Sequence, residues 1–395
     1  MKKSLFALAA VTAFAGAAQA QSSVTVYGIL DVGFASSTTR TPVVSGGQTL
    51  KSTQAGFSGV GSETTSRLGF KGVEDLGGGM SAFFTVEVAL TPTDASASGS
   101  YTDRGVTTST NYFVNRQSFV GLAKKGLGKF AIGNQYTPVH LAVGATDPGQ
   151  QNNMKGNVIY VTGNGQGAGE TTVAYTVRYN QAVTVATDSF AGFKGYAIFG
   201  QNNVDRTQLA PAYTSAAAGG NLNSQAWGLG ANYTWNKFYA AAAYQAVNQL
   251  NDSVVANTPA LVVASGTANA KDNQAYAAAT YDFGVLKAYV QWINKKATSS
   301  INSNYYVKRS AQQIGVRSFI TPTVEAWASA GTGRYTAFGS NEPTSNFNGW
   351  QVGSNYLLSK RTNLYAIYGT THTSSTSSGL AAGGSSYGVG VRHTF

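Results

Sequence analysis

The chain has 395 residues, no cysteine, and 27 basic against 16 acidic residues, which gives a formal net charge of +11. The absence of cysteine excludes disulfides and thiol-based metal or redox chemistry. Only 11% of the residues are charged, while 47 are glycine and 22 are tyrosine, whereas soluble proteins carry about 25% charged residues. No long apolar stripe at helical spacing follows residue 20, which disfavours an ordinary soluble enzyme built on amphipathic helices.

The first twenty residues have the three parts of a secretory leader. Lys2 and Lys3 precede an apolar run over 5–11, and Ala18 and Ala20 are small residues typical of a cleavage site after residue 20. A membrane anchor is the alternative, but the run falls short of the roughly 20 residues that span a bilayer. We expect a signal peptide over 1–20 and a mature chain over 21–395, where the loss of two lysines leaves 25 basic residues against 16 acidic ones, a net charge of +9.

The remaining chain alternates at period two rather than at helical spacing. The stretch 65–79 shows it well: Arg67 and Lys71 share one face of an expected strand, and Leu68 and Phe70 lie on the other. A face that carries cations must be wet, so the apolar face needs a second sheet or lipid. The same alternation recurs over 24–34, 80–90, 173–180, 227–235 and 387–395.

About sixteen such segments follow one another, and their connections alternate between short turns and long polar loops. The expected strands begin near Val24, Thr65, Met80, Tyr112, Lys129, Thr172, Phe193, Ala226, Phe238, Gln274, Val285, Lys308, Thr323, Phe347, Asn363 and Ser385. The expected short turns are 73–79, 124–128, 235–237, 282–284, 321–322 and 359–361. This polarity predicts an all-β fold, a transmembrane antiparallel β-barrel of about 16 strands, rather than a sandwich.

Aromatic residues gather near the expected short turns. They are Trp235, Tyr281, Phe283 and Tyr356. Such residues suit the interfacial girdle of a membrane barrel. The alternative is packing in a soluble core, which the polar opposite faces of the strands disfavour.

One connection differs from the others. Between Tyr136 and Glu170 no alternation is sustained, and a gap this long in a compact barrel is usually functional or disordered. It holds a patch of small apolar residues over 139–145 and a possible brief strand over 158–161. Its charges between 137 and 169 are Asp147 and Lys155, so the loop could fold into a lumen without a heavy desolvation cost.

Several runs together resemble the Gram-negative general diffusion porins over essentially the whole mature chain. They are T-S-R-L-G-F-K-G-V-E-D-L-G-G-G over 65–79, R-Q-S-F-V-G-L over 116–122, Y-D-F-G over 281–284, L-S-K-R-T over 358–362 and G-V-G-V-R-H-T-F over 388–395. The resemblance implies a homotrimer of outer-membrane barrels, each narrowed by a third external loop folded into the pore. It also implies lipid and lipopolysaccharide around the barrel, and makes Phe395 similar to the signal read by the β-barrel assembly machinery.

The resemblance also implies an arginine ladder on the wall that faces the third loop. By position in the matching motifs the ladder is Arg67, Arg116 and Arg178, and Glu87 is similar to a wall carboxylate beside it. Alternation independently puts these four residues on the wet face. Many relatives have Gly-Arg at the entry to the loop, where this chain has asparagine at 134, and they carry several loop acids, where this chain has Asp147. The pore should therefore stay net positive.

The expected function is passive diffusion of small hydrophilic solutes and ions with a weak anion preference. A channel specific for an organic anion or a sugar is one alternative, for which Tyr112, Tyr239 and Tyr289 are candidate inward residues. An outer-membrane adhesin without a pore is another, and bilayer recording would distinguish it.

Enzymatic and nucleic-acid functions find little support. The three histidines, His140, His372 and His393, lack metal-ligand spacing, and no G-x-S-x-G element is present. The basic residues form no dense run that would fit nucleic acid. We therefore expect no catalytic residue, no metal, no cofactor and no nucleic-acid partner.

Overall fold

A computed structural model describes residues 23–43, 48–94, 101–103, 106–108, 114–162, 172–206, 220–251, 269–339, 344–375 and 381–395. The leader over 1–20, Tyr112 and Glu170 lie outside these residues. In the first half of the chain the strands are β1 (Ser23–Val43), β2 (Gln48–Ser58), β3 (Arg67–Gly77), β4 (Met80–Ala89), β5 (Tyr101–Asp103), β6 (Val106–Thr108), β7 (Asn115–Lys124), β8 (Gly128–Tyr136), β9 (Arg178–Thr187) and β10 (Phe193–Arg206). In the second half they are β11 (Gly220–Trp235), β12 (Phe238–Asn251), β13 (Ala270–Asp282), β14 (Lys287–Ser299), β15 (Tyr306–Thr321), β16 (Val324–Phe338), β17 (Ser345–Leu357), β18 (Thr362–Ser375) and β19 (Ala381–Thr394).

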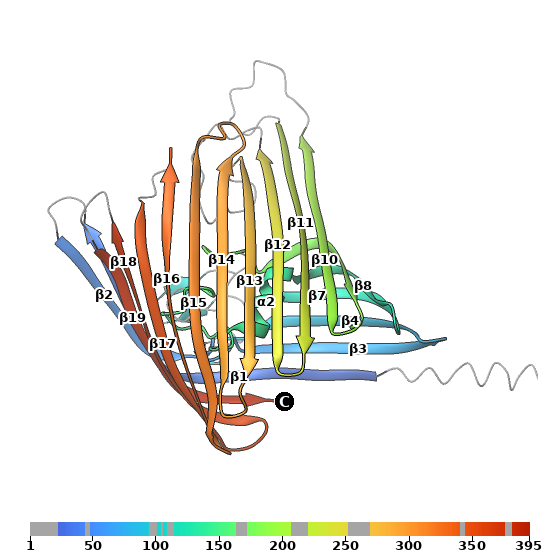
Figure 1. Ribbon diagram of the computed structural model, residues 1–395, viewed down its shortest axis with the longest axis horizontal. Helices are drawn as coiled ribbons and strands as arrows, with labels where there is room; N and C mark the ends of the chain where they lie inside the picture. The colour runs from blue at the N-terminus through green and yellow to red at the C-terminus, as the bar shows by residue number, and fades with distance from the viewer. Residues whose placement is uncertain are drawn as a thin grey trace, which may run out of the picture.

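Seventeen described strands form one antiparallel sheet that closes on itself. In the ring β1 pairs with β3, β4 pairs with β7, every other strand from β3 onward pairs with its neighbour along the chain, and β1 pairs with β19 to close the ring. The strand β2 forms a hairpin on the far half of β1, so sixteen of the seventeen strands make the barrel. In Figure 1 β12–β16 run upright in front while β3, β4 and β7 cross behind them, as strongly tilted strands on opposite walls of a barrel do. The predicted sixteen-stranded barrel is confirmed.

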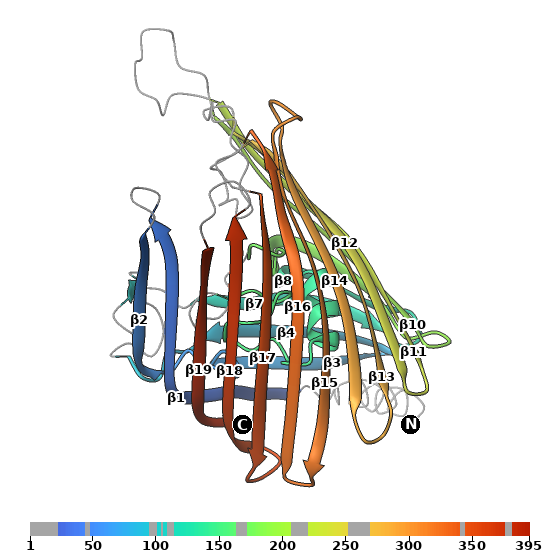
Figure 2. The same cartoon turned by 60° about the vertical axis from the view of Figure 1, so that its left-hand side comes forward.

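The first strand serves two parts of the ring. Its residues 23–29 pair with β3, its residues 29–40 pair with β19, and its far half also pairs with β2. Figure 2 shows the resulting bend, where β1 runs across the base and then rises beside β2. The hairpin β1–β2 and the small sheet of β5 and β6 were not predicted, because each lies in a stretch that sequence assigns to polar loops.

Alternation along the strands separates an apolar outside from a polar inside. On β15 the outward Ile314 is 66% exposed, whereas its neighbour Gln313 is 1% exposed. Large apolar side chains stay exposed around the ring, as an outer face in contact with lipid requires. Trp235, Tyr281, Phe283 and Tyr356 are all about half exposed at the short-turn ends of their strands. The structure therefore agrees with the predicted girdle and contradicts packing in a soluble core.

The short turns lie at one end of the barrel, and the long connections lie at the other. The turn predicted over 73–79 is tighter than expected, because β3 continues to Gly77 through an irregularity in its pairing with β4. Gly77, Gly78 and Gly79 all have positive φ angles between 59° and 79°. Only glycine adopts such a run of conformations without strain, which explains why the hairpin carries three glycines in succession.

The connection between β8 and β9 is the third long one and folds inward. Its patch of small residues forms a helix, α2 (Pro138–Thr146), which sequence did not predict. Thr137 caps the helix by accepting a hydrogen bond from His140 N, and Pro138 occupies its first turn, as both residue types favour. Within the described part of the chain, no helix has the length and apolar character to cross a membrane.

Two strand predictions inside this loop are wrong. Residues 158–161 form no strand, and β9 begins at Arg178 rather than near Thr172. The Thr172 hydroxyl accepts hydrogen bonds from the Ala174 and Tyr175 amides and so fixes a turn instead. Tyr175 is fully buried inside the barrel, so its apolar character reflects packing within the loop and not contact with lipid.

Candidate functional site

Two of the predicted ladder arginines meet the predicted wall carboxylate on the inner face of the barrel. The Arg116 Nε donates a hydrogen bond to Glu87 Oε1 over 2.8 Å, and Arg67 Nη1 lies 3.8 Å from the same oxygen. Tyr27 donates its hydroxyl to the second Glu87 oxygen over 3.1 Å. Strands β3, β4 and β7 are neighbours, so their register brings these side chains together. One carboxylate thus faces two guanidinium groups, which leaves this wall net positive.

Arg178 joins the same region from the end of the inward loop. Its guanidinium lies 5.1 Å from the centre of the Tyr136 ring, and Arg116 Nη2 donates to the Tyr136 hydroxyl over 2.9 Å. The face of an aromatic ring is electron-rich and favours a cation over it. Tyr136 therefore links two of the three arginines. We call Arg67, Glu87, Arg116 and Arg178 the arginine wall.

The loop presents a cluster of rings to the arginine wall instead of acids. His140 lies 4.4 Å from the Tyr136 ring centre and also approaches Tyr160 and Tyr175. Burial lowers the pKa of His140 well below its ordinary value of 6.5, and the nearby Arg178 and Arg116 lower it further. His140 is therefore neutral at physiological pH. It is a buried residue of the loop.

The other side of the loop packs on the opposite wall through an apolar core. Its buried members from the loop are Val139, Ala142, Val143, Val158, Ile159, Tyr160, Ala174, Tyr175 and Val177, and those from the wall are Ala241, Ala243, Tyr276, Ile293, Ala311 and Phe347. Loop and wall are thus joined as two elements of a folded core, with close packing that resists displacement. The loop is fixed against β12–β17 and faces the arginine wall with its other side.

A row of inward glutamines also holds the loop to that opposite wall. We call it the glutamine belt: Gln245 on β12, Gln274 on β13, Gln291 on β14, Gln313 on β15 and Gln351 on β17. Each side chain is at most 1% exposed. The Gln245 amide donates to Gln274 Oε1 over 2.7 Å, and the Gln313 amide donates to Gln291 Oε1 over 2.9 Å. Sequence reasoning missed these residues, because one inward glutamine per strand looks like any polar lining.

The belt bonds directly to the backbone of the loop. Thr176 N donates to Gln274 Oε1 over 2.7 Å, Val158 N donates to Gln313 Oε1 over 3.1 Å, and Gln351 Nε2 donates to the Met154 and Lys155 carbonyl oxygens over 2.7 Å each. Loop backbone groups buried in the lumen need partners, and an amide offers both a donor and an acceptor. The belt therefore supplies the hydrogen bonds that an irregular segment cannot make internally.

Three further cations on this wall also serve the loop and were missed by sequence reasoning. Lys295 Nζ donates to the Thr172 carbonyl over 3.0 Å, Arg309 Nη2 donates to the Val158 carbonyl over 2.7 Å, and Arg317 Nη1 donates to the Pro148 carbonyl over 2.7 Å. Lys295 pairs with Asp272, and Arg317 pairs with Glu325. Their charges are thus engaged by loop carbonyls and by wall carboxylates.

The structure places Asp147 at the C-terminal end of α2, inside the loop. Its carboxylate accepts hydrogen bonds from Gln151 N over 2.6 Å, from Asn157 Nδ2 over 2.8 Å and from Gln313 Nε2 over 3.4 Å. Burial raises the pKa of Asp147, although these hydrogen bonds favour its ionised form. The contacts organise the turn after α2 and join it to the glutamine belt. Its role at the constriction stays a prediction.

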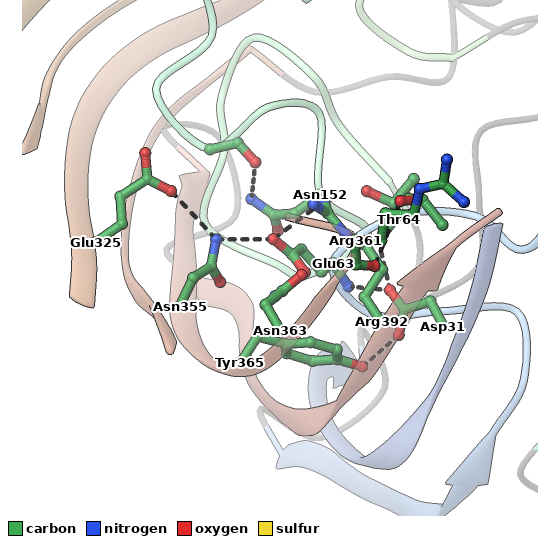
Figure 3. Close-up of polar contacts among 12 residues, drawn as sticks. Asp31, Glu63, Thr64, Asn152, Glu325, Asn355, Arg361, Asn363, Tyr365 and Arg392 are labelled. Carbon is green, nitrogen blue, oxygen red and sulfur yellow. Dashed lines mark hydrogen bonds and ion pairs between the residues drawn. The ribbon is translucent and has the colours of Figure 1, made fainter. Parts of the chain in front are cut away.

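A separate polar cluster ties the connection between β2 and β3 to the wall (Figure 3). Asp31 accepts from the Tyr365 hydroxyl over 2.6 Å and from the Glu63 and Thr64 amides. Glu63 in turn accepts from Asn355 and pairs with Arg392 at 3.4 Å. The partners of Asp31 are thus Tyr365 and the backbone of this connection. No group of three metal-binding side chains was found in the portion of the chain that is described.

Phe395 closes the seam of the barrel. Its backbone N–H and carbonyl bond to the carbonyl and N–H of Gly28 over 3.1 Å each. A Cβ on Gly28 would collide with the Phe395 ring, so the glycine makes room for the last side chain.

Comparison with known proteins agrees with this geometry. The family model described as Gram-negative porin matches residues 7–376. An outer membrane porin protein of Bordetella pertussis is 28% identical over the full length of both chains, and outer membrane porin protein 32 of Delftia acidovorans is 32% identical over half of each. Among solved structures, an anion-selective porin from Comamonas acidovorans superposes with a TM-score of 0.66 at 19% identity, covering 95% of this chain and all of that one. The outer membrane channel DcaP of Acinetobacter baumannii has a TM-score of 0.59 at 12% identity, covering 96% of this chain and 99% of that one. The chain belongs to the Gram-negative porin family, and it is a β-barrel channel of the outer membrane.

Proposed function

We propose that the channel passes small hydrophilic solutes and ions by passive diffusion, with a weak preference for anions that the arginine wall provides. The observation that carries the proposal is a charge imbalance: three arginines gather near one wall carboxylate, Glu87, while the loop acid Asp147 bonds within the loop. A relative in the comparison is described as an anion-selective porin, which supports the same preference here.

The size of the preference follows from Coulomb's law. An arginine about 7 Å from a passing ion contributes roughly 0.6 kcal/mol in a water-like dielectric, and salt lowers this contribution because the Debye length is about 8 Å. Three arginines together contribute under ~2 kcal/mol before screening, and salt lowers the resulting anion preference to about tenfold at most. The channel is thus a biased sieve without a dehydrating filter.

Reversal potentials in a salt gradient test the proposal. Planar bilayers containing the purified protein should show anion preference, and replacing Arg67, Arg116 and Arg178 together by glutamine should remove most of it. Cation preference in the native channel, or an unchanged reversal potential in the variant, would contradict the proposal.

We also propose that the channel assembles as a homotrimer, as porins typically do, and that Phe395 is the C-terminal signal for the assembly machinery. A trimer should resist mild detergent and migrate as a single large species that heating dissociates. Deletion of Phe395 should lower the amount of protein in the outer membrane more than it lowers refolding of purified chain in detergent. Equal losses in both would assign the residue to barrel closure alone.

The proposal includes a leader over 1–20, which mass spectrometry of the exported protein tests directly. The expected mature N-terminus is Gln21. A chain that retains Met1 in the outer membrane would overturn this part.

A further inference from the structure

A cavity of about 100 Å³ lies in the inner wall beside the end of the inward loop. It is bordered by the last loop residues, including Thr176, and by β9–β13 near the ends that carry the long connections. A single buried water needs about 10 to 15 Å³ measured in this way, so the cavity accommodates several waters or one small solute. None of the belt glutamines lines it, although two of its lining residues, Thr176 and Asp272, also take part in the contacts that hold the loop.

Three buried side chains that line this cavity each have one polar atom without a partner among the described residues. These atoms are Tyr179 Oη, Gln249 Oε1 and Asp272 Oδ1. Their residues are 6%, 8% and 5% exposed. A buried polar atom without a hydrogen bond costs about 1 to 3 kcal/mol, and most buried polar groups in folded proteins are satisfied. Three such atoms around one cavity indicate a polar occupant.

The surroundings of Tyr179 give no other role to its hydroxyl group. Its ring packs with the inward Ala182, Ile198 and Ala226, a setting that phenylalanine would satisfy equally well. The hydroxyl therefore adds nothing to the packing, and it has no partner among the described residues although Tyr179 lines the cavity. A hydroxyl at this position could form a hydrogen bond with a solute that enters the cavity.

The charges around the cavity exclude most ionic occupants. An anion would meet the acceptor atoms of Gln249 and Asp272. A cation would meet the guanidinium of Arg178, which lines the cavity, and Lys295, which lies 3.2 Å from Asp272 Oδ2. A neutral molecule with several hydroxyl groups avoids both conflicts, since each hydroxyl donates and accepts. The apolar Ala226 and Val247 can cover its C–H faces.

We propose that this cavity is a binding site for a small, neutral, polyhydroxylated solute of the size of a monosaccharide. Tyr179, Gln249 and Asp272 would bond to its hydroxyl groups, and Arg178 would lie between this site and the constriction. The inference rests on the channel being open to solutes, and it adds to passive diffusion a weak resting place on the way through.

Current fluctuations of the reconstituted channel test the site. Glucose is titrated over millimolar concentrations while chloride current is recorded, and bound sugar should produce saturable excess noise. Tyr179→Phe should raise the half-saturating glucose concentration about fivefold, because one hydrogen bond to the sugar is lost. Gln249→Met should raise it by a similar factor. Tyr289→Phe changes another inward, buried tyrosine that does not line the cavity, and it should leave the titration unchanged.

Charged analogues decide the class of solute. Gluconate and glucosamine should each produce less noise than glucose at equal concentration. The proposal would be overturned by stronger noise from either charged analogue, or by equal losses of glucose binding in the Tyr179 and Tyr289 variants. It would also be overturned if glucose produced no response at all, because the cavity would then hold water only. Reversal potentials recorded without sugar test the anion preference separately, so failure of one proposal is distinguishable from failure of the other.

Discussion

The two inner walls of the barrel use polar side chains in opposite ways. The arginine wall keeps charge in surplus, with one carboxylate for its guanidinium groups and a face turned toward the loop. The glutamine belt is neutral, and its amides saturate one another and the backbone of the loop. The difference shows that attraction of ions and retention of a loop require different chemistry: the first needs unbalanced charge, the second needs groups that both donate and accept.

The largest expected effect comes from breaking the belt at its centre. Gln313→Leu keeps the volume but removes the partner of the Val158 amide and of Gln291 Oε1. Because each stranded buried group costs about 1 to 3 kcal/mol, we expect a loss of about 3 kcal/mol in the free energy of unfolding. Urea titration in lipid vesicles, followed by tryptophan fluorescence, measures it.

Gln312→Leu is the matched control, since this neighbour is exposed on the outer face of β15. It should change the free energy of unfolding little. Equal losses for the two variants would mean that the belt has no special part in stability.

A slightly smaller loss of stability should follow from adding a side chain where the loop packs closely against the barrel wall. Gly369 on β18 has no room for a Cβ, which would collide with the Lys155 carbonyl oxygen. Gly369→Ala should therefore destabilise the barrel by about 2 kcal/mol and should raise the noise of the open channel. At Gly195 a Cβ would meet its nearest atom at 3.7 Å, so Gly195→Ala should do neither. A quiet Gly369→Ala channel would show that the loop tolerates displacement.

The buried histidine of the loop should make stability depend on pH. The pKa of His140 is lowered in the folded state below its ordinary 6.5, so the unfolded chain binds more protons as the pH falls through 6.5, and stability is lost. Asp147, whose pKa is raised, changes in the opposite sense. Comparison with His140→Asn isolates the histidine: between pH 7 and 5 the native protein should lose on the order of 1 kcal/mol more than the variant. Parallel profiles would contradict the buried, neutral histidine.

The smallest expected effect separates the walls by selectivity. Arg67→Gln should lower the anion preference about twofold, because salt reduces the roughly 0.6 kcal/mol of one arginine near the ion path. Arg309→Gln removes an arginine that is 2% exposed and bonded to the loop, so it should change the reversal potential less and the free energy of unfolding more. The opposite ranking would assign the ion path to the glutamine side.

Sequence predicted the parts of this molecule that depend on local periodicity. Alternation along a strand reveals its two faces, so the barrel, the short turns and the inward position of Arg67, Arg116 and Glu87 could be inferred. The belt could not, because its members lie on separate strands and meet only through the register of the sheet. The helix α2 has nine residues, too few for a clear periodic signal. The sequence pattern placed Tyr175 in a strand with its side chain facing lipid. The prediction was wrong because an apolar side chain is equally suited to packing inside a folded loop.

The pairing of β1 with β19 determines when the barrel can close. The last residue of the chain pairs with Gly28, near the start of the first strand, so the ring cannot close before the whole polypeptide has been delivered. Every shorter chain has two bare strand edges, whose free N–H and C=O groups invite pairing with other chains. Chains that lack the final strand therefore expose strand edges that are paired in the completed barrel. Until that strand is in place, such a chain needs a chaperone to cover these edges between export and insertion.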